Sequence, residues 1–213
     1  MQILKMKWLE SIERSDFMES RKLELLKEAI NELQTVKRIV NKNPKKQFLS
    51  SVPYLYYLNN GRVIPREQLL KNGRFGSAVM IAPMVGDEFL VTIEPRVFTL
   101  ESVAVSFPAG YIERGEQPLD AAKRELLEET GYQSDNFIHL DSFYQDEGVS
   151  TAFNHSYLAL DAKKVQEQNL DENEIIKYMT FTYDELLEIE KMGYLSGSNT
   201  KLTLCRIKDY LGR

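Results

Sequence analysis

Cysteine and histidine are scarce in this sequence, and their scarcity excludes several kinds of site. The one cysteine, Cys205, has no partner for a disulfide within the chain, which is the usage expected of a cytoplasmic protein. Cys205 falls in a helical pattern near the end of the chain, so we predict a buried and inert thiol. The two histidines, His139 and His155, lie far apart in the sequence. A metal centre built on histidine is therefore not expected, and each ring is predicted to be structural or at the surface.

Long apolar runs and an excess of positive charge are also lacking. No stretch approaches the roughly 18–20 apolar residues of a membrane-spanning helix, and the first residues hold no apolar run typical of a signal peptide. The formal net charge is −5, which gives no general attraction to nucleic acid or to an anionic membrane. We therefore expect neither as a partner. A phosphate compound would need a local site, and a metal ion is the simplest way to build one.

The 213 residues are enough for one core with an appendage, and 43% of them are apolar. Residues 1–45 are predicted to form an N-terminal helical segment, and residues 46–213 one folded domain. The break falls in the polar stretch 41–46, which contains Pro44. Within the first segment, 18–41 has the period of an amphipathic helix, with Lys37 interrupting its apolar seam. This helix could pack on the domain's own surface or pair with a second subunit, and the pattern favours neither.

Beyond the break, short aromatic and β-branched runs alternate with turn signals. Asn60 and Gly61 predict the turn of a hairpin, and Pro83 is expected to end the strand that begins at Gly76. The stretch 107–116 is rich in glycine and proline and is predicted to be a loop. Strands are predicted at 48–58, 62–64, 76–82, 88–93, 103–107, 137–144, 156–160 and 175–181, and helices at 118–130, 183–191 and 199–211. The alternation indicates a mixed sandwich of helices and strands, of the α+β class.

The predicted helix 118–130 places three carboxylates on one face. Glu125, Glu128 and Glu129 stand three and four residues apart, close to one helical turn. Two such charges about 4 Å apart repel by about 1 kcal/mol in water and about 4 kcal/mol in a partly buried site. Arg124 can offset one of them, and a hard divalent cation such as Mg²⁺ could offset the rest. The alternative is a solvated acidic face. The opposite, apolar stripe is predicted to hold Leu119, Ala122 and Leu126.

The surrounding string decides between these interpretations. It has glycine at 110, glutamate at 116, Arg-Glu-Leu at 124–126, Glu-Glu at 128–129 and Gly-Tyr at 131–132. This spacing matches all the fixed positions of the Nudix box, and a chance match at one starting point is on the order of one in 10⁸. The chain thus resembles the Nudix hydrolase superfamily. The resemblance implies an α/β/α sandwich with a mixed sheet, and hydrolysis of the diphosphate bond of a nucleoside-diphosphate compound with Mg²⁺, or with Mn²⁺ in its place.

The resemblance also assigns residues to the metal site. The implied ligands are the carboxylates of Glu125 and Glu129 and the carbonyl of Ala109. Glu128 is implied to be a third ligand or the general base.

The remaining box residues are implied to support these ligands. Gly110 lets the backbone approach the substrate closely. Arg124 orients the glutamates, and Glu116 pairs with it. Gly131 stops the helix in a left-handed conformation.

Residues outside the box are similar to the ADP-ribose pyrophosphatase branch. Phe107–Gly110 resembles its entry to the box, and 60–67 resembles its N-terminal hairpin. Arg96 stands where that branch uses an arginine for the substrate. Glu172 and Glu174 stand where it carries a metal ligand or general base. The stretch 145–150 lacks the proline that the branch often has there.

This branch implies the reaction of ADP-ribose to AMP and ribose 5-phosphate. It also implies a homodimer in which N-terminal strands cross, with 46–72 as the dimerisation hairpin. The aromatic run 54–58 could serve such an interface or belong to an ordinary core. Two alternatives stay open. One is a Nudix hydrolase for an NDP-sugar, NADH, a dinucleoside polyphosphate or a damaged nucleoside triphosphate, and the other is a non-catalytic nucleotide sensor.

Overall fold

The computed structural model describes residues 20–39, 41–42, 48–71, 76–99 and 102–212. The predicted helical pattern before residue 20 lies outside these ranges. Helix α2 (Ser20–Leu33) is shorter than the predicted 18–41. Its apolar stripe of Leu26, Ala29, Ile30 and Leu33 is buried, whereas Val36 beyond its end is 98% exposed. The described helix therefore ends where its seam no longer meets the core, and the interpretation of this helix as packed on the domain's own surface is confirmed.

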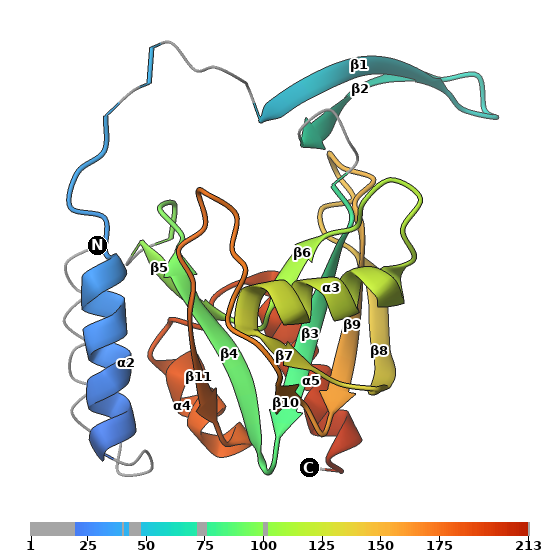
Figure 1. Ribbon diagram of the computed structural model, residues 1–213. Coiled ribbons are helices and arrows are strands. Elements are labelled where there is room, and N and C mark those ends of the chain that lie inside the picture. Colours follow the sequence, from blue (N-terminus) through green and yellow to red (C-terminus); the bar gives the residue numbers. More distant parts are fainter. Residues whose placement is uncertain (1–19, 40, 43–47, 72–75, 100–101, 213) are drawn as a thin grey trace.

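Most of the remaining elements follow the predicted order (Figure 1). The strands are β1 (Leu49–Tyr57), β2 (Val63–Lys71), β3 (Ala78–Val85), β4 (Glu88–Pro95), β5 (Val103–Ser106), β6 (Ala109–Tyr111), β7 (Tyr132–Gln133), β8 (Asn136–Tyr144), β9 (Phe153–Leu160), β10 (Lys163–Lys164) and β11 (Lys177–Phe181). The helices after α2 are α3 (Pro118–Thr130), α4 (Tyr183–Lys191) and α5 (Ser198–Tyr210).

The main sheet is mixed and is covered on both faces. Its strands run in the order β11-β4-β3-β9-β8, with β5 beside β4 and β6 beside β3. The β3–β9 pair is parallel and the other pairs are antiparallel. Helix α3 lies over one face, and α4 and α5 lie over the other (Figure 1). The predicted α+β sandwich is confirmed.

Two apolar clusters hold these layers together. Leu126 of α3 packs with Val79, Ile81 and Ala159 of the sheet, and all four are buried. Burying one such side chain stabilises the fold by roughly 1.5–3 kcal/mol. The larger cluster on the second face combines Leu186 and Ile189 of α4 with residues of α2, α5 and the sheet. Helix α3 is thus attached to the sheet through its apolar side, and its acidic residues are not needed for that packing.

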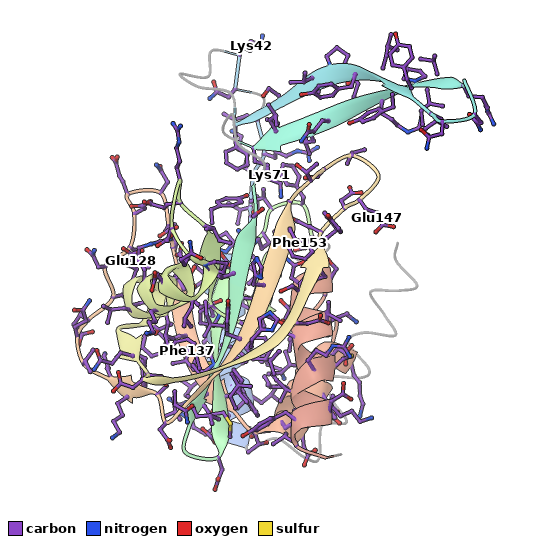
Figure 2. All side chains as sticks on the ribbon, turned by 90° about the vertical axis from the view of Figure 1, so that its right-hand side faces the viewer. Lys42, Lys71, Glu128, Phe137, Glu147 and Phe153 are labelled. Atoms are coloured by element: carbon purple, nitrogen blue, oxygen red, sulfur yellow. The ribbon has the colours of Figure 1, made fainter. Side chains whose placement is uncertain are left out.

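The β1–β2 hairpin projects from this body (Figure 1). Its strands pair from Leu49 with Lys71 to Tyr57 with Val63, and Gly61 takes a φ of 79° at the predicted turn. The base of the hairpin is anchored because Leu69 N donates to Val149 O at 2.7 Å. Lys71, labelled in Figure 2, marks the point where the hairpin joins the sheet.

Four local expectations are wrong. The strand β3 runs through Pro83, because its last residues pair with β4 across the Gly86 turn. The stretch 107–116 contains β6, which pairs with β3. Leu119 is exposed and Ala121 is buried in its place on the apolar side of α3. Cys205 is exposed, because α5 buries its neighbours Leu204 and Ile207 instead. Within the described ranges no helix is long and apolar enough to cross a membrane.

Candidate active site

Arg124 is the centre of the box in this structure. Its Nε and Nη2 donate to the two oxygens of Glu116 at 2.9 and 3.0 Å, and its Nη1 donates to Glu125 at 2.7 Å and to Glu128 at 3.0 Å. Nη2 also donates to the carbonyl of Tyr111 at 3.0 Å. Charge-assisted bonds of this kind fix geometry as well as energy. One guanidinium therefore ties the loop before α3 to two of the helix's acidic residues.

Glu116 closes the loop from the other side. Its carboxylate accepts a hydrogen bond from the backbone N–H of Glu113 at 2.8 Å as well as those from Arg124. The hydrogen bonds from Arg124 lower the pKa of Glu116 further than burial raises it. Glu116 is thus held as an anion, in agreement with the structural role implied for it.

Strand β6 lies directly against the carboxylates of α3. The N–H of Ala109 donates to Glu129 at 3.0 Å. At Gly110 a Cβ atom would lie 1.9 Å from the carboxyl carbon of Glu125, so any larger residue would push that carboxylate out of its present position. The glycine at this box position is explained by that contact. The antiparallel pairing of β6 with β3 holds this backbone in place.

Further carboxylates approach from the end of β4 and from the segment before β11. Glu94 is the last acidic residue of β4, and its side chain is 14% exposed. The charges of Glu94 and Glu174 both act on Glu129. Glu174 also acts on Glu94 and Glu125. The structure thus brings Glu174 to the predicted metal site.

The C-terminal end of α3 is fixed by a close backbone contact. Gly131 has a φ of 75°, and a Cβ atom there would lie 2.1 Å from the carbonyl of Gln166. The carbonyl of Gly131 accepts from Val165 and Gln166 at 2.9 and 3.2 Å. The Gln168 side chain donates to the carbonyls of Glu129 and Ile176. The segment that carries Glu174 is therefore attached to the helix that carries the box.

Burial and repulsion shape the electrostatics of the group. Burial raises the pKa of Glu129 well above its usual range, and the neighbouring charges of Glu94, Glu125 and Glu174 raise it further. Burial likewise raises the pKa of Glu125, against the opposing effect of Arg124. Burial and Glu174 raise the pKa of Glu94. Anionic forms of these side chains need a cation among them.

These residues fit a hard divalent cation. The donors are carboxylate and carbonyl oxygens, which Mg²⁺ and Mn²⁺ prefer. The absence of a side chain at Gly110 lets the carboxylate of Glu125 lie directly against the backbone of β6. Within the described ranges no three acidic, histidine or cysteine side chains already stand in a metal-binding arrangement. Arg124 engages Glu125 and Glu128 instead, so a cation would share or displace these contacts.

A basic and aromatic rim borders the carboxylates. Arg96 donates to Glu94 at 2.8 Å, and its charge lowers the pKa of Tyr111 against the larger, raising effect of burial. The Tyr111 ring lies 6.3 Å from the Phe48 ring, with the Lys71 ammonium 5.9 Å from its centre. The rim joins β4, β6 and the base of the hairpin, which suits an anionic ligand with a flat ring.

The site roles predicted from the sequence stay predictions, but the placement of the residues is now clear. Residues 109–110, 116, 124–125 and 128–131 form one continuous group. Arg96 lies at its rim, and Glu174 acts on it. Glu172 is exposed and is not among the charges that act on Glu125 or Glu129.

Two residues of the group were not predicted. Glu94 ends an otherwise apolar strand run, a position where an acid is unusual, and this is the signal that could have identified it. Gln168 gave no signal, because a polar residue in a loop is ordinary.

Comparison with known proteins agrees with this geometry. The model of the NUDIX domain matches residues 74–197. The "Methanol dehydrogenase activator" of Bacillus methanolicus is 33% identical over 148 residues, which cover 69% of this chain and 78% of that protein. The "ADP-ribose pyrophosphatase" of Bacillus subtilis is 31% identical over 133 residues, which cover 62% of this chain and 70% of that protein.

A solved structure shares the fold. The crystal structure of an "ADP compounds hydrolase" superposes with a TM-score of 0.68 at 21% identity, covering 81% of this chain and 91% of that one. At this identity the likeness concerns the fold alone. The match to the domain model spans more than half of the chain and contains every residue of the box. The chain therefore belongs to the Nudix family of hydrolases.

Proposed function

We propose that this protein hydrolyses the diphosphate bond of ADP-ribose, giving AMP and ribose 5-phosphate, with Mg²⁺ as its metal ion. The observation that carries the proposal is that Arg124 holds Glu125 and Glu128 beside the close-packed backbone of Gly110, next to the buried Glu129. Two relatives support the substrate, since one bears the name ADP-ribose pyrophosphatase and another, from Mus musculus, the name ADP-sugar pyrophosphatase.

The proposed metal ligands are Glu125 and Glu129 with the carbonyl of Ala109. When bound, the cation would neutralise phosphoryl oxygens and lower the pKa of a bound water. Glu129 is already fixed by the N–H of Ala109 at 3.0 Å, which orients its carboxylate toward β6. The proposed ligands therefore come from two elements that the fold already holds together.

Proton transfer needs a carboxylate that water can reach. The Glu128 side chain is 40% exposed, whereas that of Glu125 is 13% exposed. Glu174 lies on the segment opposite α3 and is exposed. We propose Glu128 or Glu174 as the general base. Glu172 is a weaker candidate, because its charge is not among the main causes of the raised pKa of Glu125 or Glu129.

The rim supports recognition of the diphosphate compound. Arg96 supplies positive charge beside Glu94, and Lys71 supplies a second positive charge against the ring of Tyr111. An anionic substrate would be drawn to these cations and held with its diphosphate facing α3. Arg96 keeps the substrate-binding role that the sequence implied.

We also propose a homodimer formed through the β1–β2 hairpin. A lone two-stranded hairpin is marginally stable in water. Tyr54, Leu55, Tyr56 and Tyr57 on β1 are all exposed, and Tyr57 is 77% exposed. A second copy of the chain would cover these side chains.

Leu55→Asp together with Tyr57→Asp should give a monomer by light scattering, whereas Tyr210→Asp on α5 should not change the mass. A wild-type monomer would reject the dimer.

The second candidate function is activation of another enzyme, and one relative suggests it. The protein from Bacillus methanolicus carries the name of an activator of another enzyme, and it covers more of this chain than the pyrophosphatase from Bacillus subtilis does. The cytoplasmic location expected from the sequence stays a prediction.

A panel of nucleotides separates these functions. We would incubate the protein with Mg²⁺ and ADP-ribose, GDP-mannose, UDP-glucose, NADH, diadenosine tetraphosphate or oxidised dGTP, and identify the products by chromatography. AMP from ADP-ribose at the highest kcat/KM supports the proposal. Faster turnover of another compound keeps the chemistry and replaces the substrate. No turnover of any compound with either Mg²⁺ or Mn²⁺ would favour a nucleotide sensor or an activator of another enzyme.

A further inference from the structure

Both histidines of the chain lie together on one face of the sheet. His139 is on β8 and His155 on β9, and their ring centres are 6.3 Å apart. Their separation in the sequence, on which no histidine metal centre was expected, does not keep them apart in the fold. They belong to a strip of aromatic side chains along the β8–β9 pair that runs from Phe137 to Phe153, both labelled in Figure 2. This strip takes no part in the site described above.

A β-bulge creates the arrangement. In a regular strand, residues three positions apart point to opposite faces. The register of β8 shifts between His139 and Asp141, so that His139 pairs with Tyr157 and Ser142 pairs with His155. The extra residue brings His139 and Ser142 to the same face. Asp141 then reaches Arg206 of α5 at 2.8 Å.

The two imidazoles converge on a single oxygen. The Oγ of Ser142 lies 2.7 Å from Nε2 of His139 and 2.8 Å from Nδ1 of His155. The hydroxyl can donate to only one of them, so the other ring must donate to it. Two ring nitrogens aimed at one point, with a hydroxyl beside them, are the donors that Zn²⁺ and similar ions prefer.

We propose that His139 and His155, with the Ser142 hydroxyl, form a binding site for an imidazole-preferring divalent transition-metal ion such as Zn²⁺. Zn–N bonds are about 2.0–2.1 Å. The point on which both rings converge is taken by the Oγ of Ser142, so an ion between the rings requires the hydroxyl to move aside as well as a shift of the rings. Water would complete the coordination, because the described residues offer no third acidic, histidine or cysteine ligand.

The surroundings favour metal binding over a charged pair of rings. Burial lowers the pKa of His155, and the nearby His139 lowers it further, so the ring of His155 is neutral and free to coordinate at neutral pH. The phenol of Tyr157 and the ring of Phe153 pack edge-on against the two imidazoles and limit their rotation. Since β8 and β9 each supply one ligand, a bound ion would cross-link the two strands.

The test uses untagged protein in a Cys205→Ser background, because the exposed thiol would compete for the ion. The chain has only two histidines, so the imidazole C–H region of its NMR spectrum reports this site alone. With Mg²⁺ present throughout, added Zn²⁺ should shift the resonances of both rings together. Isothermal titration should show one fewer zinc ion bound in His139→Gln and in His155→Gln, or an affinity weakened at least about 10-fold.

Controls separate this site from the carboxylates. Glu129→Gln should leave the zinc-induced imidazole shifts unchanged, and Ser142→Ala should retain both shifts because the two rings remain. Equal zinc binding by the wild type and both histidine variants would overturn the proposal. Imidazole C–H chemical shifts that do not change when Zn²⁺ is added would also overturn it. None of these readouts depends on hydrolysis, so failure here leaves the proposed function standing.

Discussion

Glu116 and Arg124 form a two-pronged ion pair, with Nε and Nη2 of the arginine donating to separate carboxylate oxygens at 2.9 and 3.0 Å. The pair leaves Nη1 of Arg124 for Glu125 and Glu128. A planar fork is required, because a lysine ammonium cannot serve these positions together. The glutamates of α3 are therefore positioned from the loop before the helix.

Arg124→Lys tests this arrangement. We expect kcat to fall about 10²-fold, because small displacements of catalytic groups have effects of that size. Thermal unfolding should show a folded protein, since α3 remains attached through Leu126 and its apolar neighbours. An unchanged kcat would show that the glutamates need no orientation by Arg124.

Gly110→Ala tests the contact between β6 and α3. The new Cβ would overlap the carboxylate of Glu125, which is the movable end of a side chain. The protein should therefore fold while Glu125 is pushed aside, with weaker Mg²⁺ binding and a kcat lowered about 10²-fold. Gly148→Ala is the matched control, because its Cβ would lie 3.5 Å from the nearest atom, Oδ1 of Asp146. Equal activity in the two variants would contradict the account.

Glu94 is expected to position Arg96 for the substrate. Glu94→Ala releases the guanidinium and should raise KM for ADP-ribose about 10-fold with a smaller change in kcat, which corresponds to one lost charge-assisted hydrogen bond. Glu94→Gln retains an acceptor for Arg96 and should restore most of that loss. If both variants lose kcat equally, the charge of Glu94 belongs to the metal site instead.

The attachment of α2 should depend on pH. Burial opposes the charge of Glu88, but hydrogen bonds from Lys22 and Thr180 outweigh it and lower the pKa of Glu88. The folded pKa lies below the unfolded value of about 4.5, so this stabilisation is full above that pH and is lost as the pH falls through the folded value. The pKa of Lys22 is raised despite burial, so its contribution is lost only as the pH rises beyond about 10.5.

Lys22→Met measures this contribution. Urea unfolding near neutral pH should give a free energy of unfolding about 1 kcal/mol below that of the wild type. The difference should shrink as the pH is lowered below 4.5. A difference that stays constant at low pH would mean that Lys22 stabilises α2 through packing alone.

The box and its helix could be predicted because residues close together in the sequence determine them. Helix α3 runs from Pro118 to Thr130, as expected, with proline in its first turn and Gly131 after its end. The spacing of the glutamates follows from the helical period. Strand order and the mixed sheet required the resemblance to a family, since no local pattern determines which strands pair.

Contacts between distant segments could not be predicted. Glu94 joins the site because β4 ends beside α3, and no spacing in the sequence records that meeting. The two histidines meet because of one extra residue in β8. Cys205 is exposed because the rotation of α5 is set by the sheet beneath it, and a one-position error in the helical pattern moves a residue to the surface.

The most direct test of the central claim is Mg²⁺-dependent release of AMP from ADP-ribose by the wild type and by Glu129→Gln. This substitution removes one charge at nearly constant shape, so thermal unfolding should remain cooperative. The account predicts AMP from the wild type with Mg²⁺ and none with a chelator. It also predicts a loss of several orders of magnitude in kcat for Glu129→Gln. Equal turnover by the two proteins would contradict the assignment of Glu129 and, with it, the proposed metal site.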